Sequence, residues 1–373
     1  MIRNRLAILA LGITAVAFLV PSFAYAQNDF YPHYNRYLSH GSMLSPRTAA
    51  MGGAYSALRG GEMGLVGNPA SIAFSEERYA ALLGDYIEVS SDISMVDPGL
   101  GTTLASKTEA DLWGIGAGVT WPFVWGGLGL MYDYRSDDYD SDVFPASIGR
   151  LIQSGDVERH NIGLTGGYKF DDQLAVGYRY NYIDSNNDTA VDYIGPGPAA
   201  NLVSIGEDFT GHKNHLGAQY MANEMFTFGL DGYYGIGDLD SNVTGDSDAD
   251  SYAIRAGAAW TYDQTIPLLV ALDINYESRE IDGRMANVDD DLWGIHLGAE
   301  YEMVDNFFLR AGYQMEDFDY EDHIAAINES PTVSTWSLGL GYQYEQFSID
   351  YGFMYSDTGD ADMMHVIGIG FRF

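Results

Sequence analysis

Few side chains in this sequence are spaced for acid–base, nucleophilic or metal chemistry. His212 and His215 lie three residues apart on a predicted strand, where successive side chains alternate between faces, so the two rings point to opposite sides. The chain has no cysteine, which removes thiol nucleophiles and thiolate-held metals. No serine or aspartate stands at a recognisable spacing from a histidine. We therefore predict no catalytic site, no metal site and no cofactor.

The acidic side chains gather in short runs between predicted strands. Asp246, Asp248 and Asp250 begin like a calcium loop, but Ser251 replaces the required glycine and Gly257 the closing glutamate, so an EF-hand is rejected. Further acidic runs are Asp137, Asp138, Asp140 and Asp142, and Asp289, Asp290 and Asp291. Two interpretations stay open for them: a solvated acidic rim, or loose Ca²⁺ or Mg²⁺ binding that bridges to lipopolysaccharide phosphates.

The composition excludes two broad classes of protein. A net charge of −35 argues against nucleic-acid binding, because contact with phosphates needs clustered Lys and Arg. High charge with few aromatics would indicate disorder, but aromatics make up 14% of this chain and include 28 tyrosines. A chain rich in Tyr and Gly and free of cysteine is typical of the Gram-negative cell envelope.

The first 26 residues are predicted to be a secretory signal. Arg3 and Arg5 give a positive start, residues 6–20 form an apolar run, and residues 24–26 read Ala-Tyr-Ala, a small-x-small cleavage pattern. The apolar run is shorter than the roughly 20 residues that a transmembrane helix needs, and Pro21 ends it. We exclude residues 1–26 from the fold.

From Arg78 onward, hydrophobicity alternates with a period of two, which is typical of strands with one apolar and one polar face. Residues 174–182 are an example, with Leu174, Val176 and Tyr178 on one face and Gly177 and Arg179 on the other. Fourteen such segments are centred near residues 86, 116, 130, 164, 178, 216, 230, 256, 272, 296, 310, 338, 351 and 368. No segment after residue 26 is apolar enough to span a bilayer as a helix, so membrane insertion requires a closed barrel.

The connections between these segments alternate in length. Short ones lie at 122–126, 171–172, 222–224, 263–265, 304–306 and 345–346, and the longest of the others runs from about 185 to 208. Short periplasmic turns opposite long loops, with aromatic residues at the strand ends, are the pattern of outer-membrane barrels. The sequence predicts an all-β, fourteen-stranded antiparallel transmembrane β-barrel over residues 78–373. A soluble sandwich would also alternate, but would have no reason for regular short and long loops.

Residues 27–77 do not fit the strand pattern and are predicted to be a hatch inside the lumen. They are rich in glycine, which lets backbone approach backbone closely. Residues 27–75 carry three arginines (36, 47 and 59) against two acids. Inward acids of the strands are therefore expected to hold this segment by charge: Asp133, Asp231, Asp273, Glu277, Glu300 and Asp350. The alternative is a flexible periplasmic tail.

Two short motifs connect the chain with a known family. Residues 50–55, Ala-Met-Gly-Gly-Ala-Tyr, followed by residues 67–70, Gly-Asn-Pro-Ala, resemble the N-terminal hatch of the OMPP1/FadL/TodX family of outer-membrane transporters. PorV/PorQ-like relatives share the phrase. The last residues, with apolar positions 367, 369 and 371 and terminal Phe373, resemble the C-terminal signal that barrel-assembly machinery recognises.

The resemblance implies passive uptake of hydrophobic small molecules, such as long-chain fatty acids or hydrocarbons, through the Gram-negative outer membrane. It assigns Asn68, Pro69 and Ala70 to the gating hatch, with Gly52 and Gly53 as its packing turn. Alternatives are a PorV-like binding module for secreted proteins and a general diffusion porin. Family members release cargo sideways at a kinked third strand. Here that strand, 127–135, has no proline and reads as regular alternation, which leaves a lateral opening in doubt.

Two of the predicted long loops are less polar than exposed loops need to be, and such patches often mark ligand sites. The candidate capture residues are Phe144, Ile148, Leu151 and Ile152 in one loop, with helical spacing, and Tyr193, Ile194, Leu202 and Val203 in another. They form a landing surface for a hydrophobic ligand, or they simply pack the loops together over the barrel mouth. Both interpretations stay open.

Overall fold

The computed structural model describes residues 44–96, 103–145, 150–194, 200–242, 245–262, 267–283, 287–322, 327–330, 332–357 and 361–373. The predicted signal, residues 1–26, lies outside these ranges, as do residues 27–43 of the predicted hatch. Within the described ranges, no helix has the length and apolar character needed to cross a membrane.

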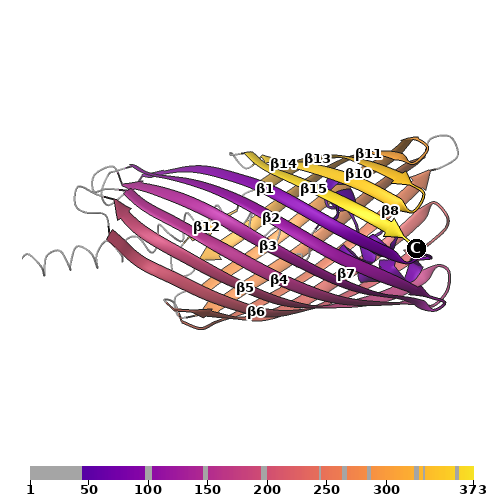
Figure 1. Cartoon of the computed structure of the whole chain (residues 1–373), viewed down its shortest axis with the longest axis horizontal. Helices are drawn as coiled ribbons and strands as arrows, with labels where there is room; N and C mark the ends of the chain where they lie inside the picture. Colours follow the sequence, from indigo (N-terminus) through magenta and orange to yellow (C-terminus); the bar gives the residue numbers. More distant parts are fainter. Residues whose placement is uncertain are drawn as a thin grey trace, which may run out of the picture.

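Long antiparallel strands make up most of the chain (Figure 1). They are β1 (Tyr79–Val96), β2 (Thr103–Phe123), β3 (Gly126–Pro145), β4 (Arg150–Lys169), β5 (Leu174–Ile194), β6 (Ala200–Met221), β7 (Phe226–Ser241), β8 (Ser247–Tyr262), β9 (Leu268–Gly283), β10 (Asn287–Val304), β11 (Phe307–Asp322), β12 (Ile327–Glu329), β13 (Thr332–Tyr344), β14 (Phe347–Asp357) and β15 (Ala361–Arg372). Every predicted segment centre falls within one of them.

The sheet closes on itself as a barrel. From β1 to β11 and from β13 to β15 each strand pairs with its neighbours in sequence, and β1 also pairs with β15. The short β12 and the longer β13 both pair with β11 and form one interrupted strand of the wall. The fifteen strands therefore build a fourteen-stranded antiparallel barrel, and the predicted fold class is confirmed.

The two faces of the wall differ as the alternation predicted. Large apolar side chains such as Leu216, Leu338 and Trp336 are exposed on the outside, while many inward positions carry polar, charged or small residues. The rings of Trp121, Trp125, Tyr168 and others lie at strand ends, where amphipathic aromatics meet the membrane interface. The exterior is therefore built to face lipid.

Five of the six short predicted connections are confirmed, and the sixth, 263–265, lies outside the described residues. The long predicted loop at 185–208 is wrong in extent. β5 continues to Ile194 and β6 begins at Ala200, so most of that stretch is paired strand. Strands of 20–22 residues exceed the roughly 9–11 that cross the bilayer. Beyond the lipid the outer face has no need to be apolar, so the hydrophobic alternation fades although the pairing continues.

Three short helices lie inside the barrel near the end that carries the short turns (Figure 1). They are α2 (Pro46–Ala50), α3 (Gly61–Val66) and the 3₁₀ helix η1 (Pro69–Phe74). The side chain of Ser45 caps α2 and that of Asn68 caps η1. These two helices each start with a proline, which suits the first helical position. We refer to residues 44–77 as the hatch.

Candidate functional site

The hatch rests on a belt of small residues around the inner wall. Glycines that would bring a Cβ within 3 Å of hatch atoms are Gly118, Gly127, Gly129, Gly167, Gly177, Gly217, Gly229, Gly257, Gly298, Gly312, Gly339, Gly352 and Gly368. At Gly177 an added Cβ would lie 2.2 Å from the carbonyl carbon of Pro69. Only a residue without a side chain lets the two backbones come so close. The belt explains why the lumen can hold the hatch so tightly.

The hatch turn at Gly52 and Gly53 needs glycine for a second reason. Both residues have positive φ, +64° and +76°, a left-handed conformation that other residues adopt only at a cost. A Cβ on Gly52 would also lie 2.7 Å from the backbone nitrogen of Tyr313. The turn that follows α2 therefore lies directly against β10 and β11, and its role in gating stays a prediction.

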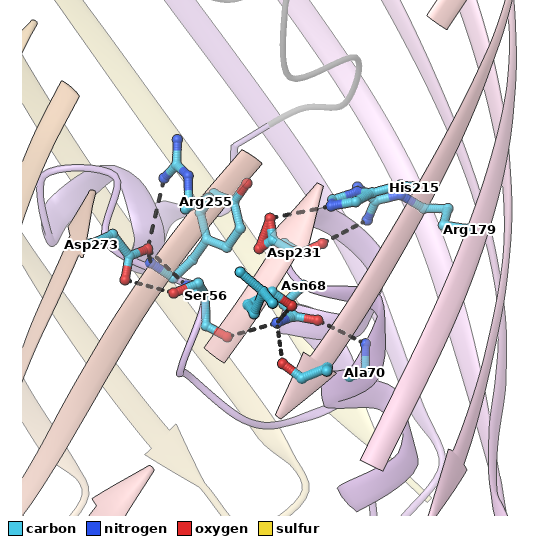
Figure 2. A network of polar contacts seen from close by, with 12 residues as sticks. Ser56, Asn68, Ala70, Arg179, His215, Asp231, Arg255 and Asp273 are labelled. Carbon is cyan, nitrogen blue, oxygen red and sulfur yellow. Dashed lines mark hydrogen bonds and ion pairs between the residues drawn. The ribbon is translucent and has the colours of Figure 1, made fainter. Parts of the chain in front are cut away.

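Asn68 ties two arms of the hatch together and to the wall (Figure 2). Its Oδ1 accepts from the backbone N–H of Ala70 at 3.0 Å, and its Nδ2 donates to the carbonyl of Ser56 at 2.9 Å and to that of Ala218 on β6 at 3.2 Å. Asn68 is fully buried. A buried carbonyl without a hydrogen-bond partner is costly. The Asn68 amide gives the carbonyls of Ser56 and Ala218 such a partner and so stabilises the hatch against the wall.

Asp273 of β9 holds the middle of the hatch. It accepts from the backbone N–H groups of Tyr55 and Ser56 at 2.8 and 2.9 Å and from the Ser56 hydroxyl at 2.7 Å. Arg255 of β8 donates to the carbonyl of Gly53 at 2.7 Å and lies 4.3 Å from the Tyr55 ring centroid. The inward position predicted for Asp273 is confirmed, but its partners are mainly backbone amides rather than a hatch arginine.

A second group of polar side chains holds the α3 end (Figure 2). Arg179 of β5 donates to the carbonyls of Leu65 and Gly67 at 2.7 and 3.1 Å, and to Nδ1 of His215 at 2.8 Å. Because a guanidinium only donates, Nδ1 of His215 must be the unprotonated nitrogen. Nε2–H then points at Asp231, 3.3 Å away. His215 faces the lumen while His212 bonds Tyr180 on the outer side, so the predicted opposite orientation is confirmed.

Among the described residues, a direct ion pair between a hatch arginine and a wall acid occurs at Arg47. Its Nε and Nη2 donate to Glu300 of β10 at 2.9 and 2.7 Å. Arg310 of β11 donates to Glu300 at 2.6 Å and to Asp350 of β14 at 2.6 Å. Burial alone would lower the pKa of Arg47, but Glu300 more than offsets it and raises that pKa. We call these four residues the α2 latch.

The latch borders a cavity of about 470 Å³ at the turn end of the barrel. Hatch residues Arg59, Glu62 and Phe74 line one side, and wall residues Gln343 and Ser348 line the other. Burial, and then the nearby charge of Asp350, raise the pKa of Glu62 to about 7. The cavity lining is largely polar.

An apolar cluster lies on the other side of α2, inside the lumen. Ile87, Leu112, Met354, Met364 and Val366 face inward from β1, β2, β14 and β15 and pack with Ala49 of α2 and Ala110. On β14, Met354 lies two residues farther from the short turn than Gly352, which touches α2, whereas Asp350 lies two residues closer. The cluster is therefore above α2 and the cavity below it. None of the candidate residues predicted from the sequence belongs to this cluster.

The candidate capture residues lie on strand ends rather than in loops. Phe144 belongs to β3, Leu151 and Ile152 to β4, Tyr193 and Ile194 to β5, and Leu202 and Val203 to β6. Ile148 lies outside the described residues. The predicted helical spacing of the first group is wrong for its strand residues, because the pairing of β3, β4 and β5 continues past the membrane. Leu151 stands opposite Tyr193 in the register, and capture itself stays a prediction.

Comparisons with known proteins agree with this architecture. A family model described as an outer membrane protein beta-barrel domain matches residues 193–344. The toluene transporter TodX of Pseudomonas putida has a TM-score of 0.61 at 14% identity, covering 88% of this chain and 98% of that one. A FadL homologue of Pseudomonas aeruginosa has a TM-score of 0.60 at 13% identity, covering 89% of this chain and 98% of that one. The toluene transporter TbuX of Ralstonia pickettii has a TM-score of 0.54 at 15% identity, covering 88% of this chain and 98% of that one.

The chain has the fold of the FadL and TodX channels. The matched barrel model and the apolar outer wall assign it to the Gram-negative outer membrane, as predicted. The putative uncharacterized protein YaiT of Escherichia coli (strain K12) is 31% identical over 159 residues, 38% of this chain, and the match spans 15% of the length of that curated relative.

Replacing Gly177 with leucine should loosen the hatch. The side chain would collide with Pro69, and overpacking of this kind costs about 1–3 kcal/mol, so exposure of the hatch should rise by about tenfold. The chain has no cysteine, and Ala57→Cys, at a buried hatch position, would report exposure through its rate of maleimide labelling. Gly166→Leu is the control, since its Cβ would meet only the Leu128 side chain at 3.5 Å. Equal labelling rates in Gly177→Leu and Gly166→Leu would contradict a role of the glycine belt in holding the hatch.

Asn68→Ala should loosen the same contacts, because it removes the η1 cap and donors to two carbonyls. Loss of such a cap costs about 1–2 kcal/mol. Labelling at Ala57→Cys should increase severalfold, while Asn214→Ala, which loses only a contact with Tyr178 on the outer face, should leave it unchanged. Unaltered labelling in Asn68→Ala would show that this amide does not hold the hatch.

Closure of the hatch should weaken between about pH 4.5 and pH 7. Glu62 keeps its proton up to about pH 7 in the closed state, but loses it near its ordinary value of 4.5 once released. The closed state therefore gains stability from the protonated acid at low pH, and loses it as the pH rises toward 7. Bilayer conductance should be higher at pH 8 than at pH 5, and Glu62→Gln should flatten this difference. Glu76 is exposed, so Glu76→Gln is the control. If Glu76→Gln reduces the conductance difference as much as Glu62→Gln does, Glu62 is not the group that controls closure.

Proposed function

We propose that this protein is a passive channel for hydrophobic small molecules, closed by its hatch. The observation that carries the proposal is the apolar cluster above α2. Among the described apolar clusters, it is the one in which side chains of four strands, β1, β2, β14 and β15, meet the hatch helix α2. A hydrophobic molecule that entered the barrel would partition to this place.

The chemistry of the cluster favours compounds of variable shape over one specific ligand. Two of its side chains, Met354 and Met364, are unbranched thioethers that adapt to different shapes and contact aromatic rings well. The buried members of the cluster are aliphatic and thioether side chains, with Leu44 and Tyr139 packed against them, so the cluster favours the apolar parts of a cargo molecule. Hydrocarbons and acyl chains both meet these requirements.

The named cargo of similar structures supports a first choice of compound. TodX and TbuX are described as toluene transporters and CymD as a monoaromatic hydrocarbon channel. We therefore propose monoaromatic hydrocarbons as the first cargo to test, with long-chain fatty acids as the second. The candidate capture residues at the outer strand ends would receive either compound before it reaches the cluster.

We propose that the hatch is the gate. Its predicted gating residues are fixed to the wall by the contacts described above: Gly52 and Gly53 against β10 and β11, Asn68 against β6, and Pro69 and Ala70 against β5. The same contacts oppose the general-porin alternative, since water and ions would have to pass where backbone touches backbone. A PorV-like role would need a protein partner at the loops, and pull-down from outer-membrane extracts would find one.

Met364→Gln should reduce uptake, because it places an amide in the apolar cluster at a cost of about 1–3 kcal/mol. The measurement is uptake of radiolabelled toluene, and separately of oleate, by cells that lack other channels for these compounds. The neighbouring Met363 faces outward, so Met363→Gln is a matched control that should transport normally. Equal loss in the two variants would contradict a binding role for the cluster.

A further inference from the structure

Three outward-facing histidines of the barrel share one arrangement of side chains. In each case a histidine lies against two aromatic residues, two positions apart on the neighbouring strand, and its Nδ1 is hydrogen-bonded to the hydroxyl of the first of them, a tyrosine. The hydroxyl–Nδ1 distances are 2.9 Å for Tyr132 and His160, 2.6 Å for Tyr180 and His212, and 2.8 Å for Tyr351 and His365. We call these three rings the clasped histidines.

The second aromatic ring of each unit completes the clasp. The ring centroids of Tyr134, Tyr182 and Phe353 lie 5.1, 5.6 and 5.2 Å from that of their histidine. The bonded tyrosine rings lie 6.2, 5.9 and 6.1 Å away in the same order. Aromatic faces at about this distance attract a cation, so the clasp suits an imidazolium as well as an imidazole. Three units with nearly the same distances point to one common role.

The clasped histidines lie where the apolar part of the outer face ends. On β4 the outward residues from Tyr168 to Ile162 are aromatic, aliphatic or glycine. His160 comes next, and the acids Glu158 and Asp156 follow it. In all three units the tyrosine hydroxyl reaches a histidine two residues farther from the turn end than its own register partner. Because the short turns of outer-membrane barrels are periplasmic, this level is the boundary with the outer leaflet.

Each clasp leaves one ring nitrogen available as a donor. A phenol that donates to Nδ1 leaves the ring proton on Nε2. Within the described residues, no group accepts a hydrogen bond from Nε2 of His160, His212 or His365. His160 is exposed and the other two rings are half-buried on the outer face. The Nε2–H groups are therefore left for an acceptor that lies outside the chain, at the membrane boundary.

Charge indicates what that acceptor is. In the part of the chain whose side chains are described, the arginines and lysines of the strands beyond the turn end face the lumen, as Arg135 does. Other tyrosines of the boundary donate to carboxylates instead, Tyr86 to Asp111 at 2.6 Å and Tyr276 to Asp291 at 2.9 Å. The outer leaflet of this membrane is built from a phosphorylated glycolipid, whose phosphates are strong acceptors. The clasped histidines are the outward groups that complement them.

We propose that the clasped histidines bind the phosphate groups of the outer-leaflet glycolipid, lipid A. Nε2–H of each ring donates to a phosphate oxygen, the tyrosine hydroxyl fixes the ring through Nδ1, and the acyl chains of the same lipid lie on the apolar residues below. Two units lie on β3–β6 and the third on β14 and β15, so the contact occupies the side of the barrel that runs from β14 through β1 to β6 (Figure 1). This binding surface is separate from the lumen and does not depend on the proposed function.

Native mass spectrometry of the full chain mixed with purified lipid A tests the proposal. The probes are hexa-acylated lipid A with two phosphates and the same lipid after both phosphates have been removed by a phosphatase. The wild-type barrel should retain the phosphorylated lipid at least fivefold more than the dephosphorylated one. The triple variant His160→Phe, His212→Phe and His365→Phe should lose this preference, because phenylalanine keeps the ring packing but has no N–H group.

The matched control replaces carboxylates that accept from tyrosines at the same boundary, in the triple variant Asp111→Asn, Asp250→Asn and Asp291→Asn. It should keep or strengthen the preference. Heat-modifiable migration in gel electrophoresis identifies folded barrels, and if the histidine triple variant does not fold, the three single variants replace it and each should lower the preference. Equal retention of the two lipids by the wild-type chain, an unchanged preference in the histidine variants, or an equal loss in the acid control would overturn the proposal.

Discussion

The structure depends on backbone-to-backbone contact between the hatch and the inner wall. A fourteen-stranded barrel encloses more space than its own side chains fill, so an inserted segment must reach the wall on all sides. Glycines such as Gly177 and Gly312 remove the side chains that would hold the two apart, and the hatch lies directly on the strands. The gain is a tight closure. The consequence is that most single side-chain additions along this belt would push the hatch away.

Close contact alone would bury backbone polar groups without partners, which is costly in a dry interior. Side chains of the wall supply these partners. Asp273 accepts hydrogen bonds from N–H groups of the hatch backbone, and Arg179, Arg255 and Gln219 donate hydrogen bonds to its carbonyls. Charge thus serves mainly to satisfy the hatch backbone. The exception is α2, whose latch at Arg47 pairs charge with charge beside a cavity.

The sequence predicted the barrel well because lipid imposes a simple rule on every strand: the outer face must be apolar. Residues 174–182 show it plainly, and the short turns follow from it. The strand extensions near Tyr193 and Leu202 were mistaken for loops because no lipid contacts them, so the rule no longer applies. Asn68 and Gly52 were found through a family motif, and the structure supplies the contacts that the motif could not.

The apolar cluster was missed for a different reason. Its residues come from four strands and one helix that are far apart in sequence, so no local sequence pattern predicts it. One signal was present: around Met364 and Val366 both faces of β15 are apolar, which a lipid-facing strand with a polar lumen would not need. The distinct partners of Asp273 and Glu300 could not be predicted either, because both are inward acids with the same local pattern.

Single-channel conductance of the full chain beside a chain lacking residues 27–77 tests the central claim most directly. A hatch that fills the lumen predicts almost no current through the full chain and large, stable steps after the deletion. Equal, large currents from both chains would contradict closure by the hatch, and with it the account of the glycine belt and the gate.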